Sequence, residues 1–125
     1  MASELEVKNF LGRFRTAVEL RGKAVWKSDK NRQSLEDLGL TEKIATDIII
    51  RDLGPDQYAK GPDPDDLEPA RELWVFGHRI KGVELYIKVC MDERAGRFIP
   101  IVWSFHKAER PLTYPLKEPA SKRGE

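Results

Sequence analysis

Four polar side chains in the C-terminal half of the sequence form a set that can act on a phosphodiester. Tyr86 and Lys88 are two residues apart in one apolar segment, and Ser104 and His106 are two residues apart in the next. Because successive side chains of a β-strand point to opposite faces, each pair shares a face if its segment is a strand. Cleavage next to a 2′-hydroxyl needs a base, an acid for the leaving 5′-oxygen, and positive charge at the phosphate. Histidine suits either proton transfer near neutral pH, and lysine supplies the charge.

Apolar residues alternate with these polar ones and predict the buried face of two strands, Val83–Cys90 and Phe98–Phe105. The residues expected on the core face are Leu85, Ile87, Val89, Ile99, Ile101, Trp103 and Phe105. Val102 is expected on the other face, together with Ser104 and His106. If one antiparallel sheet joins both strands, the four polar side chains share its second face. A solvated sheet face without a function has the same pattern.

The N-terminal part of the chain predicts an amphipathic helix followed by a weak strand. Apolar residues recur at helical spacing from Glu4 to about Leu20, and Gly22 follows the end of this pattern. A short strand is expected within Lys23–Lys27, where three apolar residues precede a polar turn.

Two further helices are expected before the centre of the chain. Ser34 is expected to cap a short helix that stops at Gly39. Thr41 is expected to cap the next helix, which Gly54 and Pro55 end.

The centre of the chain predicts a loop and then the first strand of a meander. Gly61–Pro69 holds three prolines and four acidic residues in nine positions, which excludes a buried helix or a central strand, so we expect a surface loop. Leu73–Phe76 is expected as a strand. His78–Gly82 is expected as a turn that carries Arg79 and Lys81 into the next strand. Three sequential strands joined by short polar links form an antiparallel meander.

The fold class that follows is α+β, with N-terminal helices packed on one face of a curled antiparallel sheet of three or more strands. We expect a single domain over residues 1–125, in which 117–125 form a frayed tail. The tail is expected to pack through Leu112, Tyr114 and Leu116 before it frays.

Composition excludes several functional classes. The net charge of +1 provides no global attraction for a polyanion, so any nucleic-acid contact must come from locally gathered cations. The single Cys90 forms no internal disulfide, and with only two histidines we expect no metal site and no cofactor. The chain has no apolar run long enough for a membrane helix and no signal peptide pattern, so we expect a cytoplasmic protein without a membrane partner.

Three stretches carry a pattern beyond the alternation. They read LGLTEKIATDIIIRDLGPDQYAKGP, ELWVFGHRIKGVELYIKV and IVWSFHKAERPLTYP, and they lie within roughly Leu35–Pro115, a span of about two thirds of the chain. A helix ends in a polar turn followed by an aromatic residue and a lysine, here Asp56, Tyr58 and Lys60. A Trp-bearing strand, a Tyr-x-Lys strand and a strand ending in Ser-Phe and a basic residue follow. In this order the stretches resemble the MqsR family of toxins, which share a fold with the RelE-type messenger-RNA-cleaving toxins.

The resemblance implies an endoribonuclease that cuts single-stranded messenger RNA without a metal, through a 2′,3′-cyclic phosphate. It also implies growth inhibition until an antitoxin, encoded by the adjacent gene, neutralises the toxin. Lys60 and Tyr86 stand at positions of active-site residues in the family, and His106 stands where one branch has lysine. Val75 follows the Trp where that branch has glutamine.

The site expected from the residues and the resemblance together has two parts. The catalytic residues are His106, Lys60 and Tyr86, with His106 as the general acid or base. The substrate-binding residues are Lys88, Ser104, Arg79 and Lys81. The alternative is a non-catalytic RNA- or protein-binding regulatory module on the same fold, which the near-neutral charge slightly favours.

Overall fold

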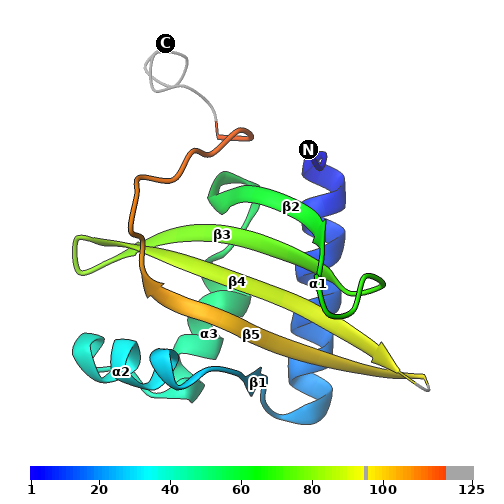
Figure 1. Cartoon of the computed structure of the whole chain (residues 1–125), viewed down its shortest axis with the longest axis horizontal. Helices are drawn as coiled ribbons and strands as arrows, with labels where there is room; N and C mark the ends of the chain where they lie inside the picture. Colours follow the sequence, from blue (N-terminus) through cyan, green and yellow to red (C-terminus); the bar gives the residue numbers. More distant parts are fainter. Residues whose placement is uncertain (95, 118–125) are drawn as a thin grey trace.

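The computed structural model describes residues 1–94 and 96–117. Three helices accompany one open sheet of five strands in this part of the chain (Figure 1). The helices are α1 (Glu4–Arg21), α2 (Asp29–Leu38) and α3 (Glu42–Asp52), and a 3-10 turn, η1, spans Pro55–Gln57. The strands are β1 (Val25–Trp26), β2 (Tyr58–Pro64), β3 (Glu72–Ile80), β4 (Val83–Arg94) and β5 (Arg97–Lys107). The α+β class and the order of helices before the sheet are confirmed.

The sheet has the strand order β1-β5-β4-β3-β2. Strands β3, β4 and β5 form the expected antiparallel meander, and β2 adds to it antiparallel to β3. The expectation of a wholly antiparallel sheet is wrong, because β1 pairs parallel to β5 through Val25 and Trp26. The sheet is therefore mixed, with the expected short strand filling part of its β5 edge.

Side chains at the helix ends explain where the first and third helices begin. The Ser3 hydroxyl accepts from the Glu6 N–H while the Glu6 carboxylate accepts from the Ser3 N–H, which forms a complete capping box for α1. Gly22 ends α1 in the left-handed conformation, with φ +80°. Thr41 caps α3 by accepting from the Ile44 N–H, as expected. The predicted starts of both helices are confirmed.

The predicted start of α2 at Ser34 is wrong. Ser28 is the N-cap instead, with its hydroxyl accepting from the Lys30 N–H, so the helix starts six residues earlier. The early start brings Asn31 to the β5 edge beyond the short β1. There its amide accepts from the Phe105 N–H at 2.9 Å and donates to the Trp103 carbonyl at 3.1 Å. The side chain thus satisfies backbone groups that no neighbouring strand reaches.

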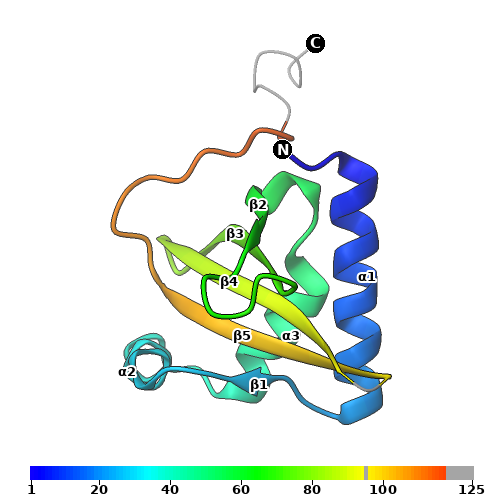
Figure 2. The same cartoon turned by 45° about the vertical axis from the view of Figure 1, so that its right-hand side comes forward.

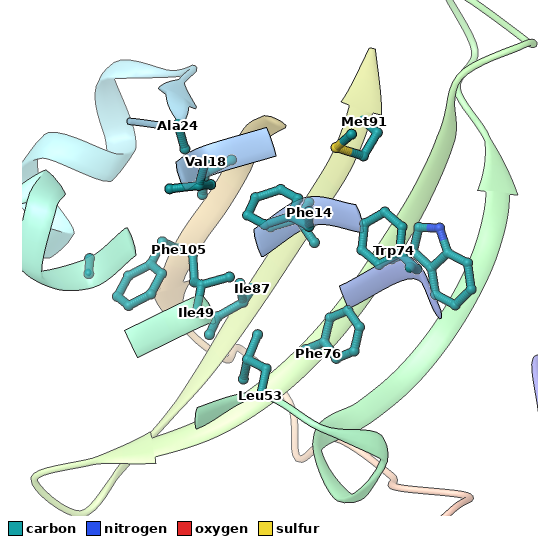
Figure 3. Packing of buried hydrophobic residues seen from close by; sticks show 14 of the residues in the cluster. Phe14, Val18, Ala24, Ile49, Leu53, Trp74, Phe76, Ile87, Met91 and Phe105 are labelled. Carbon is teal, nitrogen blue, oxygen red and sulfur yellow. The ribbon is translucent and has the colours of Figure 1, made fainter. Parts of the chain in front are cut away.

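The hydrophobic core lies between the sheet and the helices α1 and α3 (Figures 2 and 3). Phe10 of α1 stacks on Trp74 of β3, with ring centroids 4.6 Å apart. From β4, Leu85, Ile87 and Val89 are fully buried on this side, as the alternation predicted. Burying such side chains stabilises the fold by roughly 1.5–3 kcal/mol each. The opposite side carries no helix and is called the helix-free face here.

The acidic, proline-rich segment is only partly a loop, so the expectation for Gly61–Pro69 is corrected. Its first four residues belong to β2, an edge strand that pairs with β3 through register shifts. Prolines are compatible with an edge strand because its outer N–H groups need no partner. Tyr58, fully buried at the start of β2, holds the strand by donating its hydroxyl to the Gly61 carbonyl.

The hairpin between β3 and β4 is tighter than expected. The predicted turn His78–Gly82 is wrong, because β3 continues to Ile80 and pairs with Val83. Only Lys81 and Gly82, both with positive φ, form the turn. Arg79 therefore lies in a strand, whereas Lys81 lies in the turn as expected.

A β-bulge in β5 changes which side chains reach the core. Lys88 pairs with Ser104, whereas the next residue of β4, Val89, pairs with Val102, so Trp103 is an extra residue in β5. Val102 is fully buried and belongs to the hydrophobic core, which contradicts its expected placement. The expected core placement of Trp103, Ile101 and Ile99 is wrong for the same reason. Register places Ile101 beside Cys90 and Ile99 beside Asp92 on the helix-free face.

The C-terminal tail crosses the sheet on the side opposite α1 (Figure 2). Leu112 donates its N–H to the Glu84 carboxylate at 3.1 Å, and the Tyr114 hydroxyl donates to it at 2.7 Å. Leu116 packs against the core cluster, so packing through these three residues is confirmed. The expected frayed segment 117–125 lies, except for Lys117, outside the described residues.

Candidate functional site

Tyr86 and His106 form a stacked pair on the helix-free face. They are direct partners across β4 and β5, and their rings lie 5.3 Å apart at 14° to each other. The His106 Nδ1 lies 2.9 Å from the Lys107 carbonyl oxygen, which can only accept a hydrogen bond. The proton of the neutral ring therefore lies on Nδ1, and its lone pair lies on Nε2. No described residue forms a hydrogen bond with Nε2, so this nitrogen is available to a ligand.

Lys88 and Ser104 form the neighbouring pair of the same face. They are also direct partners across β4 and β5, one step before the bulge. Two residues along a strand correspond to about 6.8 Å, so this pair lies beside the stacked rings. Lys88 forms no ion pair with any described residue. The structure thus brings together a base, a hydroxyl, a phenol and a cation, as the alternation predicted.

Lys60 lies on the same face but at the edge of the sheet. It pairs with Val75, which in turn pairs with Lys88, so the row runs from β2 across to β5. With neighbouring strands 4.7–4.9 Å apart, its Cα is about 10 Å from that of Lys88 and about 14 Å from that of Ser104. The structure does not bring Lys60 into the cluster around His106.

Arg79 and Lys81 are also separated from the cluster. Arg79 pairs with Glu84 across the hairpin, and its charge helps to lower the pKa of that carboxyl. Lys81 donates its ammonium to the Leu38 carbonyl at the end of α2, at 2.9 Å. This contact directs Lys81 to the helix, where it satisfies a terminal carbonyl.

The second histidine belongs to the other face of the sheet. His78 pairs with the fully buried Leu85, and its Nε2 lies 3.6 Å from the Asp52 carboxylate at the end of α3. The structure therefore separates the two histidines by the thickness of the sheet.

The contact between Glu84 and the tail, which sequence reasoning missed, bounds the candidate site at one end. The Tyr114 hydrogen bond, supported by Leu112, lowers the pKa of Glu84. Burial, and then the same bond to Glu84, raises the pKa of Tyr114. Gly77 makes room for this contact, since a Cβ there would lie 2.1 Å from the Tyr114 hydroxyl. Alternation along β4 puts Glu84 on the same face as Tyr86 but carries no signal for its partner in the tail.

The contacts of Arg71, also missed, bound the site at the other end. From the end of the β2–β3 loop, Arg71 contacts the Asp92 carboxylate at 3.1 Å and the Asp65 carboxylate at 3.5 Å. Its guanidinium lies 5.8 Å from the centre of the Trp103 ring. Burial raises the pKa of the neighbouring Cys90 to about 11, so its thiol stays protonated and is no nucleophile at neutral pH.

These two sets of contacts hold three carboxylates in place at the ends of the face. The carboxylates of Asp65, Asp92 and Glu84 are bonded to Arg71, to Tyr114 and to the backbone of the tail. Glu84 keeps its negative charge, because hydrogen bonds from a phenol and a backbone N–H lower its pKa and do not neutralise it, and register places Asp63 on the same face. Lys88 and Lys60, which form no ion pair with any described residue, are the cations that can contact an anion there. Within residues 1–94 and 96–117, no three His, Cys, Asp or Glu side chains are grouped to hold a metal ion, and no helix is long and apolar enough to cross a membrane.

A cavity of about 350 Å³ lies apart from this cluster, beside α1 and the end of β4. Phe10, Trp74 and Met91 form its apolar part, and acidic side chains such as Glu68 and Glu93 line its rim. We place the candidate site on the helix-free face and not in this cavity, because the four carboxylates of its lining outnumber its two arginines, Arg13 and Arg71, and disfavour a phosphate.

No protein-family model, curated protein or solved structure matches this chain. The fold and the site define the protein as an α+β protein with one helix-covered sheet face and one helix-free face that carries the polar cluster.

Proposed function

We propose that this chain is an endoribonuclease of the messenger-RNA-cleaving toxin type, with the RelE/MqsR-like fold, and that an antitoxin neutralises it in the cytoplasm. The observation that carries the proposal is the stacked Tyr86–His106 pair, with Nε2 of His106 available, beside Lys88 and Ser104. This set contains the groups that cleavage through a 2′,3′-cyclic phosphate needs, without a metal.

In the proposed reaction, Nε2 of His106 takes the proton of the 2′-hydroxyl. The 2′-oxygen then attacks the phosphorus, and the bond from phosphorus to the 5′-oxygen breaks. Lys88 stabilises the negative charge of the phosphorane, and its ammonium donates the proton with which the 5′-oxygen leaves. The products are a 2′,3′-cyclic phosphate and a 5′-hydroxyl; His106 then releases its extra proton to water, and Lys88 takes one up from water.

Tyr86 and Ser104 have supporting roles in this proposal. The phenol packs flat against the imidazole, which fixes the ring plane, and its hydroxyl can donate to a phosphate oxygen. Ser104 can donate to the same phosphate from its place opposite Lys88. We assign Lys60 to a neighbouring phosphate of the strand, because about 10 Å separates its Cα from that of Lys88.

The test is cleavage of a single-stranded RNA by the purified protein in EDTA. His106→Ala should lower the cleavage rate by about 10²- to 10⁴-fold, as expected for loss of a general base. His78→Ala is the matched control, because it removes the other imidazole from the opposite face, and it should cleave at the wild-type rate. The fragments should carry a cyclic phosphate and a 5′-hydroxyl. Full activity of His106→Ala would contradict the proposed mechanism.

A non-catalytic binding module on the same fold gives a different result in this experiment. It would bind the RNA and leave it intact, with the same outcome for both histidine variants. Expression adds an independent readout, since a toxin should arrest the growth of its host unless the antitoxin is produced with it. Unimpeded growth at high expression of the wild type would argue for the binding module.

A further inference from the structure

The β-bulge of β5 brings a third aromatic ring to the helix-free face. Without the extra residue, regular alternation would direct Trp103 to the core, between Val102 and Ser104. Bulges are frequent beside active sites, where they redirect a side chain. Here the bulge moves a large aromatic side chain out of the core and leaves it partly exposed.

Two contacts fix the orientation of the Trp103 ring. Its Nε1 donates to the Cys90 sulfur at 3.1 Å, so the polar edge of the indole is already satisfied. The Arg71 guanidinium, held by Asp65 and Asp92, lies 5.8 Å from the ring centre. Because the N–H is bonded and Arg71 lies over one face of the indole, the surface left for a ligand is the other face of the ring. The ring is therefore held in place before any ligand arrives.

The other two tryptophans of the chain pack on the helix-covered side of the sheet. Trp74 is 5% exposed and stacks against Phe10 in the core. Trp26 packs against Phe105, and its Nε1 donates to the Thr46 hydroxyl. Both have structural partners on the helix-covered side, whereas Trp103 lies on the face that carries His106.

We propose that Trp103, held by Arg71, is a base-stacking subsite for the nucleotide next to the scissile phosphate. The proposal rests on the proposed function, because it takes single-stranded RNA as the ligand. Trp103 and His106 are three residues apart, which corresponds to about 10 Å along a strand. A base on Trp103 would therefore place the following backbone near Lys88 and Ser104. Stacking of this kind is tolerant of sequence because every base has a π face.

The test is binding of a single-stranded RNA with 2′-O-methyl groups, which the proposed reaction cannot cleave. In the wild type the oligonucleotide should quench part of the tryptophan fluorescence. Trp103→Phe should lose this quenching, whereas Trp26→Phe, the matched control, should retain it. Trp103→Ala should bind about 5- to 150-fold more weakly, the range reported by alanine substitution of stacking residues. Urea unfolding of each variant verifies that it is folded.

The outcomes separate this subsite from the catalytic proposal. If Trp103→Phe and wild type show the same quenching and affinity, the subsite is wrong, whether or not RNA is cut. Cleavage by the wild type with that result would leave the endoribonuclease in place. Quenching that depends on Trp103, without any cleavage of unmodified RNA, would support the subsite and remove the catalytic function.

Discussion

The two faces of the sheet use neighbouring residues for different purposes. On the helix-covered face, Phe76, Ile87 and Phe105 are fully buried in one core. One residue away along the strands, Tyr86 and His106 are stacked and partly exposed on the other face. The first set keeps the sheet folded, and the second is free of that requirement. Substitutions on the helix-covered face should therefore lower the free energy of unfolding more than substitutions on the helix-free face.

The largest expected difference between the faces is in the free energy of unfolding. Phe76→Ala should lose about 3–5 kcal/mol, because it removes a fully buried ring and leaves a cavity. Tyr86→Ala should lose only about 1 kcal/mol, the size of one aromatic pair. Urea unfolding monitored by circular dichroism measures both. Equal losses would show that the helix-free face is as tightly packed as the core.

A smaller effect is expected at the strand edge that both faces share. Asn31→Ala should lose about 2 kcal/mol, because the Phe105 N–H and the Trp103 carbonyl are left without their partner. Gln33→Ala on the same helix is the control, since Gln33 is exposed and bonds only Asp37 among the described residues. The same unfolding measurement applies. If both variants match the wild type, the amide does not support β5.

The smallest effect is expected where the tail meets the helix-free face. Tyr114→Phe should lose about 1 kcal/mol at neutral pH, because it removes a hydrogen bond to the Glu84 carboxylate. The folded-state pKa of Glu84 is lowered, so this stabilisation is present above the unfolded pKa of about 4.3 and is lost as the pH falls through the folded value. The unfolding curves of variant and wild type should therefore converge in acid. Thr113→Ala serves as the control, and a difference independent of pH would contradict the role of Glu84.

The elements that could be predicted from the sequence are those whose determinants lie close together in the sequence. The ends of α1 and the start of α3 could be predicted because the apolar spacing from Glu4, and Gly22 and Thr41 at the helix ends, are local signals. The strand β2 could not, because its prolines argue against a strand unless its edge position is known. The parallel pairing of β1 likewise depends on where distant elements lie.

The candidate site could be predicted on β4 and only partly on β5. Alternation in β4 is regular, so Tyr86 and Lys88 were assigned to the correct face. In β5 both Val102 and Trp103 are apolar, so hydrophobicity alone gave no sign that one residue is extra. The error affected the residues before the bulge, and the residues after it, Ser104 and His106, were assigned correctly.

In the proposed function, RNA binds to the face that carries His106 and not to the face that carries His78. The chain has only two histidines, so their imidazole Cε1–H signals can be followed individually by NMR. On titration with a 2′-O-methyl single-stranded RNA, the His106 signal should shift while the His78 signal stays in place. A shift of His78 alone, or no shift of either signal at saturating RNA, would contradict the account.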